Sequence, residues 1–142
     1  IAGGAQPKIP GHENGNFFEP TIFDDVKVKT KLAQDEIFGP VLSVMDYTDD
    51  QQVIEDANGT SFGLVAGVWS RDIRRAMDFA QRIKAGTVWI NTFRQTQISA
   101  PFGGYKMSGI GREKGLAGLR EYCEEKSTWI DLNDDPISYF DG

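Results

Sequence analysis

One segment of the chain repeats apolar residues at the spacing of an amphipathic helix. The residues in question are Ile73, Ala76, Met77, Ala80 and Ile83. Intervals of three and four residues place these side chains on one face, which predicts a helix over 73–83 with that face buried. Gly86 follows closely, and we expect it to be the C-terminal cap, because glycine commonly ends helices.

Short apolar runs between turn signals predict the strands. The run GLVAGVWS (63–70) is nearly all apolar, which favours a strand buried on both faces, as in a parallel sheet. TVWIN (87–91) is predicted to be the next strand. Earlier in the chain, FFEPTIF (17–23) contains Pro20, which favours an edge or irregular strand, and 41–47 is a further candidate. STWIDL (127–132) is predicted to be the last strand.

Three further helical segments alternate with these strands. Thr48 is predicted to cap a helix that runs to about Ala57, with acidic residues in the first turn, where the helix dipole favours negative charge. Asn58-Gly59 is expected to end it. A single turn is predicted over 30–35, and a longer helix over about 113–124. Alternating strands and helices predict an α/β fold, a parallel sheet with flanking helices.

Composition and charge exclude several functions. The chain has 142 residues, about one domain, with 39% apolar and 25% charged residues, which is typical of globular proteins. Its net charge of -6 and lack of a basic patch argue against a nucleic-acid partner. No apolar run approaches the roughly 18 residues of a membrane-spanning helix, so no membrane partner is expected.

The cysteine content and the first residue suggest where the chain works and what it is part of. Cys123 is the only cysteine, which rules out an internal disulfide and is typical of a reducing compartment, so we expect a cytoplasmic location. The chain begins with Ile1 rather than Met and opens directly on IAGGAQPKIPG. We therefore expect a piece of a longer protein or a processed product.

The residues that most often carry chemistry are scarce. His12 and Cys123 are far apart in the sequence and make no metal-ligand set, so no metal is expected. Carboxylates at Glu121, Glu124 and Glu125 surround Cys123 and disfavour a reactive thiolate. No catalytic residue is therefore assigned on this chain.

The glycines of SGIGREKG come close to a dinucleotide-binding fingerprint. Gly109, Gly111 and Gly115 have nearly the required spacing, but they follow a loop rather than a buried strand. The better interpretation is that they allow tight turns and positive φ angles. A phosphate-binding role stays open as the minor alternative.

Two loops are candidates for a binding site. The segment from Thr92 to Gly111 is long for a compact domain and carries Phe93, Phe102 and Tyr105, which either line an apolar pocket or simply pack. Glu36-Ile37-Phe38-Gly39-Pro40 is either a turn before the strand at 41 or a ligand contact. In the second case Glu36 accepts hydrogen bonds from a polyol such as a ribose, and Phe38 lies against a flat ring.

Several motifs resemble those of NAD(P)-dependent aldehyde dehydrogenases. EIFGPV (36–41), AGTVWIN (85–91) and PFGGYKMSGIGREKG (101–115) occur in the order and at about the spacing seen in that family, and the upstream NGNFFEPTIF is also similar. The resemblance runs from about residue 1 to 132. It implies the C-terminal part of a catalytic domain, with 1–112 as a partial catalytic domain, 113–132 as a helix and an oligomerisation strand, and 133–142 as a tail.

The resemblance also implies roles for individual residues. Glu36 matches a glutamate that binds the nicotinamide ribose, and Phe38 an aromatic beside the nicotinamide. Phe102 matches a residue of the substrate tunnel. Phe93 and 94–99, which include Arg94, match a variable region that shapes substrate preference, where Arg94 is either a solvated loop arginine or a partner for the carboxylate of a semialdehyde. The strand over 127–132 matches one that extends a neighbouring subunit's sheet, which implies a homo-oligomer.

The same resemblance implies that the reacting groups lie elsewhere. In the family, the cysteine nucleophile, the general-base glutamate and the Rossmann-like domain precede the segment matched here. NAD or NADP would be held mainly by that missing N-terminal part, and this chain alone is expected to be inactive. Two alternatives stay open: a non-enzymatic interaction or assembly module that retains the fold, and an acylating relative that releases acyl-CoA.

Overall fold

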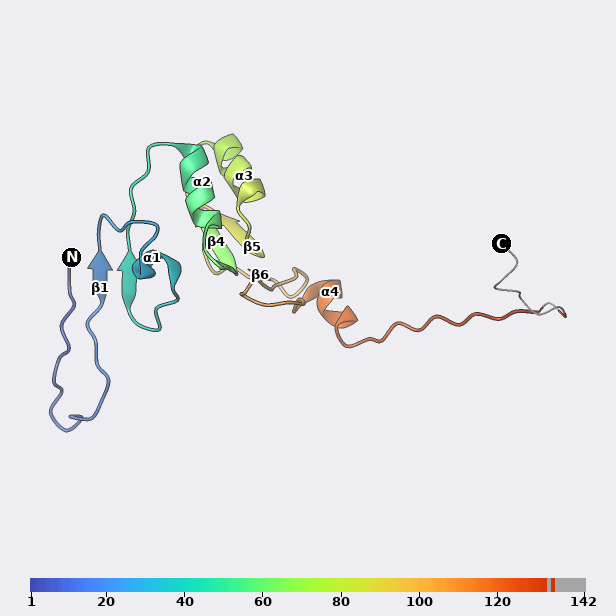
Figure 1. The fold of residues 1–142 in the computed structure, drawn as a ribbon, viewed down its shortest axis with the longest axis horizontal. Coiled ribbons are helices and arrows are strands. Elements are labelled where there is room, and N and C mark those ends of the chain that lie inside the picture. The colour runs from blue at the N-terminus through green and yellow to red at the C-terminus, as the bar shows by residue number, and fades with distance from the viewer. Residues whose placement is uncertain (133, 135–142) are drawn as a thin grey trace.

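The computed structural model describes residues 1–132 and Asp134. Figure 1 shows the elements in chain order, and their bounds are as follows: β1 Thr21–Phe23, α1 Lys31–Gln34, β2 Val41–Ser43, α2 Asp50–Asn58, β3 Phe62–Gly63, β4 Val65–Val68, α3 Ile73–Arg82, β5 Thr87–Ile90, β6 Tyr105–Lys106 and α4 Gly115–Arg120. Helices and strands alternate for most of the chain, which confirms the α/β class.

The unit β4–α3–β5 forms the centre of the molecule. β4 and β5 pair in parallel, with Val65 opposite Thr87 and Val68 opposite Ile90. Helix α3 packs against both strands and buries Ala76 and Phe79. The prediction of a helix over this segment is confirmed, but the buried face matches the predicted one only in part: Ile73 and Met77 are exposed, and the buried Phe79 was not among the predicted residues.

Gly86 does not cap α3, so that prediction was wrong. The helix ends at Arg82 with Ile83 as its C-cap, and Gly86 instead lies directly before β5. Its N–H donates to the Gly63 carbonyl at 3.1 Å. A Cβ atom at this position would lie only 1.6 Å from the Gly103 carbonyl oxygen, so glycine is required there by the close approach of another backbone segment.

The predicted strand 63–70 is divided between two partners. β3 pairs in antiparallel fashion with β6, and after Leu64 the chain continues as β4 beside β5. The expectation that both faces are buried was wrong: Leu64 is 40% exposed and Trp69 is 62% exposed. Among the described residues, β4 has a single strand neighbour, which leaves much of its surface uncovered.

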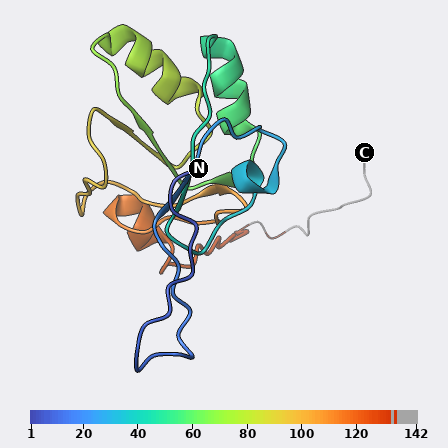
Figure 2. The same ribbon diagram turned by 90° about the vertical axis from the view of Figure 1, so that its left-hand side faces the viewer.

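A separate two-stranded parallel sheet is formed by β1 and β2, with Thr21 opposite Val41 and Phe23 opposite Ser43. Both strands are shorter than predicted. Ala2 also exchanges two hydrogen bonds with Ile22 of β1. The N-terminal loop between Ala2 and Ile22 therefore begins and ends at the edge of this sheet, as Figure 2 shows. The described residues thus contain three two-stranded sheets, two of them parallel, rather than one continuous parallel sheet.

Helix α2 begins one residue later than predicted, with Asp49 rather than Thr48 as its N-cap. The Asp49 carboxylate accepts the N–H of Gln52 at 2.8 Å, which satisfies a donor that the first helical turn leaves unpaired. The helix ends at Asn58 with Gly59 as its C-cap, as predicted. Arg75 on α3 donates two hydrogen bonds to the Asp50 carboxylate, at 2.8 and 2.5 Å, and so ties the two helices together.

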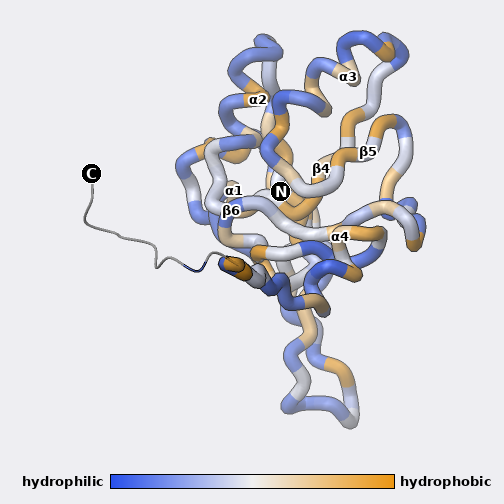
Figure 3. The backbone as a smooth tube through the Cα atoms, turned by 90° about the vertical axis from the view of Figure 1, so that its right-hand side faces the viewer, coloured by the Kyte–Doolittle hydropathy of each residue, from blue (hydrophilic) through white to orange (hydrophobic). Residues whose placement is uncertain are grey.

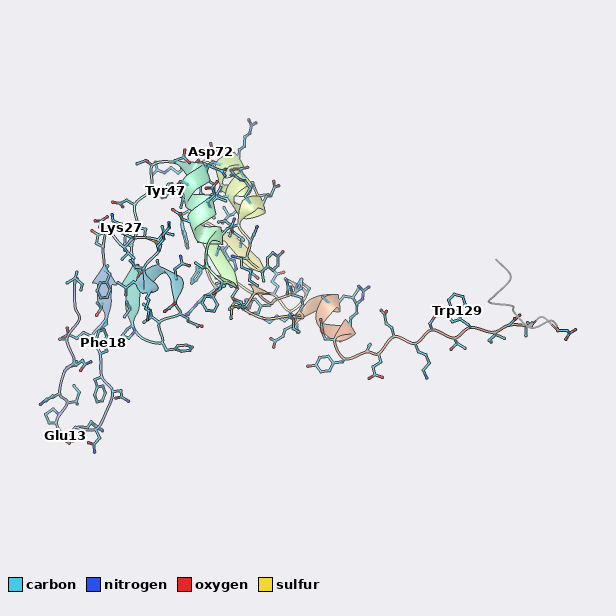
Figure 4. All side chains as sticks on the ribbon, viewed as in Figure 1. Glu13, Phe18, Lys27, Tyr47, Asp72 and Trp129 are labelled. Atoms are coloured by element: carbon cyan, nitrogen blue, oxygen red, sulfur yellow. The ribbon has the colours of Figure 1, made fainter. Side chains whose placement is uncertain are left out.

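The C-terminal part differs most from the prediction. Helix α4 is shorter than the predicted 113–124, because the N–H and C=O of Glu113 pair with Phe102 instead of entering a helix. Residues 127–132 form no strand; Figures 1 and 4 show this segment running away from the body, with Trp129 92% exposed. The predicted tail 133–142 lies outside the described residues, apart from Asp134.

The chain exposes far more surface than a compact protein of its length. Its accessible surface is 12183 Å², whereas a folded monomer of 142 residues exposes about 7,300 Å². Many large apolar side chains are exposed, among them Leu64, Trp69, Leu116 and Leu119, and Figure 3 shows hydrophobic stretches along β4, β5 and α4. This surface is typical of a segment that normally packs against further polypeptide.

Candidate functional site

Glu36 and Phe38 lie on a tight turn between α1 and β2. Hydrogen bonds from Gly39 N–H to the Ile37 carbonyl and from Val41 N–H to the Gly39 carbonyl, each 2.8 Å, fold the turn. The Glu36 side chain is exposed and has no hydrogen-bond or ion-pair partner among the described residues. Phe38 is 93% exposed, so neither side chain serves to hold the turn together.

The two side chains border different hollows. Glu36 lines a depression of about 610 Å³ together with Phe62, Leu64 and Met107. Phe38 lines another of about 550 Å³, formed mainly by the N-terminal loop with Phe17 and Phe18. Glu36 therefore lies near β3 and β6, whereas Phe38 lies beside the N-terminal loop.

The N-terminal loop beside Phe38 has its own internal contact. The Gly11 N–H donates to the Glu13 carboxylate at 2.8 Å, and this bond lowers the pKa of Glu13. Glu13 lies at the far tip of the loop in Figure 4. His12 meets the Phe17 ring edge-on, with centroids 6.3 Å apart, so its imidazole packs rather than approaching other ligand-type residues.

Phe93 and Arg94 lie just after β5. The Phe93 ring packs between Trp69 and Trp89, at centroid distances of 6.3 and 5.0 Å. The Arg94 guanidinium lies over the Phe93 ring at 5.9 Å, and its backbone adopts a left-handed φ of 60°. A non-glycine residue seldom adopts this conformation unless its surroundings impose it.

Phe102 lies in a different environment. Its N–H and C=O pair with Glu113, at 2.8 and 2.7 Å, and the Lys114 ammonium lies 5.7 Å from its ring centroid. It lines a hollow of about 1150 Å³, which Ile98 and Leu116 also line and which includes neither Phe93 nor Arg94. The described chain thus does not join the three predicted substrate residues into one closed pocket.

The structure also shows contacts that the sequence analysis missed. The Arg112 guanidinium donates to the carbonyls of Gly104 and Gly111, at 2.9 and 2.7 Å, and closes the loop that follows Phe102. At the end of β5, the Asn91 side chain bonds twice to the backbone of Ser70. An asparagine directly after a strand was the available signal, since asparagine tolerates turns and bonds backbone groups.

The glycine-rich segment adopts the conformation that the sequence favoured. Gly109, Gly111 and Gly115 all have positive φ, at 133°, 79° and 57°. A Cβ atom on Gly115 would also lie 2.7 Å from the Ser99 carbonyl oxygen. These glycines therefore fold the loop, in line with the turn interpretation.

Cys123 is exposed, and its Sγ lies 3.5 Å from the Leu119 carbonyl oxygen. Among residues 1–132 and 134, no three histidine, cysteine or carboxylate side chains gather as metal ligands would. Within the same range, no helix is both long and apolar enough to cross a bilayer.

Comparison with known proteins decides the family. Residues 1–128 match the model of the aldehyde dehydrogenase family. The chain belongs to this family. It is 49% identical over 130 residues to the betaine aldehyde dehydrogenase of Brucella anthropi, and 47% identical to that of Brucella melitensis biotype 2. Each alignment covers 92% of this chain but only 27% of the relative, so the chain spans about a quarter of the curated aldehyde dehydrogenases that it matches.

Solved structures agree with this assignment. An indole-3-acetaldehyde dehydrogenase in complex with NAD⁺ superposes with a TM-score of 0.82 at 45% identity, over 93% of this chain and 26% of that one. A betaine aldehyde dehydrogenase from Staphylococcus aureus, also with NAD⁺, gives a TM-score of 0.86 at 40% identity, over 99% of this chain and 29% of that one. The resemblance in the sequence motifs is thereby confirmed.

Proposed function

We propose that this chain is the C-terminal segment of an NAD(P)-dependent aldehyde dehydrogenase that oxidises an aldehyde to a carboxylic acid. One observation carries the proposal: a family match over 1–128 occupies about a quarter of the relatives' length. The large uncovered apolar surface supports it, since the remaining polypeptide would bury that surface. Because the reacting cysteine and general base are expected on that remainder, the chain alone is inactive.

Glu36 and Phe38 are proposed to contact the cofactor, NAD or NADP. The exposed, unpartnered Glu36 carboxylate fits a group that accepts hydrogen bonds from ribose hydroxyls, and the exposed Phe38 ring offers an apolar face. When bound, the nicotinamide supplies a hydride acceptor. One carboxylate and one ring cannot hold a whole dinucleotide, so most of the binding energy would come from the rest of the enzyme.

Phe93, Arg94 and Phe102 are proposed to border the aldehyde pocket. Phe93 and Phe102 offer apolar walls, both of them incomplete in this chain. The exposed Arg94 guanidinium is proposed to pair with an anionic group of the substrate, so that aldehydes carrying a carboxylate are favoured. A neutral aldehyde would gain no binding energy from this arginine.

Assembly is proposed to involve residues 127–132. This segment carries Trp129, Ile130 and Leu132 exposed, and its composition is typical of a strand, which would present an open edge to another chain. Adding it to the sheet of a neighbouring subunit would bury these side chains in a homo-oligomer. The single cysteine accords with a cytoplasmic location for the assembled enzyme.

The test is to express the chain together with the coding sequence that precedes it in phase, here called the extended protein. NAD(P)H formation is then followed with a panel of small, aromatic and anionic aldehydes and with both cofactors. We expect oxidation of at least one class, and full activity in a Cys123→Ser variant. An extended protein that self-associates but oxidises none of the aldehydes in the panel would favour the non-enzymatic assembly module instead.

A further inference from the structure

The side chain of Asn91 continues the hydrogen-bond ladder between β4 and β5. The last main-chain bond of this ladder runs from the Asn91 N–H to the Val68 carbonyl at 2.8 Å. Beyond it, the Asn91 carboxamide oxygen accepts the Ser70 N–H and its amide nitrogen donates to the Ser70 carbonyl, each at 2.9 Å. The Asn91 backbone turns into the left-handed region at φ 54°, so the chain changes direction while the side chain holds the end of β4.

A second bond anchors the chain four residues later. The Trp89 indole N–H donates to the Gln95 carbonyl at 2.8 Å. Trp89 is only 9% exposed and belongs to the small buried core. A buried indole with its one donor satisfied is held firmly, so it also holds the carbonyl to which it donates.

Residues 91–95, here called the 91–95 turn, are therefore fixed at both ends. Between the two anchors, Phe93 packs edge-on against Trp89 at 5.0 Å, and Arg94 keeps its left-handed backbone with its guanidinium over the Phe93 ring. An unusual backbone conformation persists only where its surroundings impose it. Here the surroundings are the two anchors and the aromatic contact.

We propose that Asn91 and Trp89 are positioning residues that set substrate selectivity by holding the 91–95 turn in one arrangement. The inference rests on the proposed function, in which Phe93 and Arg94 border the aldehyde pocket. With the turn fixed, the Phe93 ring sets the space left for the substrate. Arg94 sets the position at which an anionic group of the substrate binds. Neither positioning residue needs to touch the aldehyde.

This role differs from a purely structural one in what it predicts. A residue that only stabilises the fold, when removed, lowers the amount of folded enzyme and affects all aldehydes alike. A residue that positions the 91–95 turn affects aldehydes that reach Phe93 or Arg94, while a two-carbon aldehyde that fits any arrangement is spared. The pattern across substrates therefore separates the two roles.

The chain offers a matched control in Asn58. Its side chain also makes two bonds to main chain, donating to the Arg82 carbonyl at 2.9 Å and accepting the Lys84 N–H at 2.7 Å, but it joins α2 to the end of α3, away from the 91–95 turn. Asn58→Ala thus removes the same kind of contact as Asn91→Ala. Asn91→Gly is a second variant, because glycine adopts positive φ freely and only the side-chain bonds are lost.

Steady-state kinetics of the extended protein test the proposal with acetaldehyde, phenylacetaldehyde and succinic semialdehyde. In Asn91→Ala and Asn91→Gly, KM for the two larger aldehydes should rise about tenfold while kcat/KM for acetaldehyde stays within about twofold, the scale of one misplaced pocket contact. Asn58→Ala should leave the ratios between the three aldehydes unchanged.

Each other outcome overturns a defined part of the account. Equal changes for all three aldehydes, or no change in Asn91→Gly, overturn the positioning role while the enzyme's activity stands. An unchanged extended protein that oxidises no aldehyde at all overturns the proposed function, and the positioning role with it. Hydrogen exchange at the Ser70 amide then still reports whether the Asn91 bond exists, since only the Asn91 variants should accelerate it.

Discussion

Replacing Gly86 by alanine should disrupt the close packing of the backbone before β5 against the backbone at Gly103, the residue that follows Phe102. An added Cβ would lie 1.6 Å from the Gly103 carbonyl oxygen and 2.8 Å from its carbonyl carbon. Real Cβ atoms essentially never come within 3.0 Å of such an atom, so the two backbone segments would have to separate by about 1.4 Å. Both obstacles are main-chain atoms, which cannot rotate away as a side chain would.

The cost of this separation can be set against known overpacking mutations. Added methyl groups in packed sites cost about 1–3 kcal/mol, and a backbone clash belongs at the upper end, so we expect a loss of about 3 kcal/mol in the free energy of unfolding. Movement of Gly103 would also carry its neighbour Phe102, and KM for aldehydes that reach that ring should rise.

Urea unfolding of the extended protein measures the first effect. Gly39→Ala is the matched control, because a Cβ there meets no atom within 4 Å, and its φ is not positive. It should change the free energy of unfolding by no more than about 0.5 kcal/mol. If Gly86→Ala proved as mild as Gly39→Ala, the close approach of Gly86 to Gly103 would be wrong.

Three further predictions concern the core, the pocket and the assembly. Phe79→Ala empties a buried site under α3 and should cost about 3–5 kcal/mol in urea unfolding; a loss below 1 kcal/mol would contradict its place in the core. Arg94→Ala should raise KM about tenfold for anionic aldehydes only, the scale of one hydrogen bond to a charged group, and an equal effect on neutral aldehydes would refute the pairing. Deleting 127–142 should reduce the mass of the assembly in light scattering, and an assembly of unchanged size would exclude residues 127–132 as the joining strand.

The sequence predicts best those elements whose stability comes from their own apolar face. The helix at 73–82 is the clearest case: the spacing predicted the helix and the burial of Ala76, although Ile73 and Met77 stay exposed and Phe79 is buried instead. The first and last residues of an element are harder to predict, because neighbouring residues compete for the capping positions. Thr48 and Asp49 are both good caps, and only the geometry shows that the Asp49 carboxylate reaches the Gln52 N–H. Near α4, Glu113 pairs with Phe102, a long-range contact that no local pattern reveals.

The strand over 127–132 shows a different limit. Its alternating, β-prone residues suit a strand, but a strand forms only where its backbone groups find a ladder partner. Among the described strands none pairs with residues 127–132, and Trp129, Ile130 and Leu132 are exposed. The burial of both faces expected of 63–70 fails for a related reason: among the described strands β4 pairs with β5 alone, and Leu64 and Trp69 stay exposed.

The candidate site was reached by resemblance more than by physical pattern. The residues alone favoured a turn for Glu36, and its carboxylate is exposed with no partner among the described residues. Asn91 was visible as the end of a strand, but its φ and its two bonds to Ser70 arise from tertiary contacts. Left-handed residues other than glycine can rarely be read from sequence, which is why the anchors of the 91–95 turn emerged only from the structure.

The most direct test compares NAD(P)H formation by this chain alone and by the extended protein, at equal molar concentration, with the best aldehyde and cofactor of the panel. We predict a steady rate from the extended protein and none above background from residues 1–142 alone. A steady, aldehyde-dependent rate from the isolated chain would contradict the account, because the reacting groups would then have to lie on the chain itself.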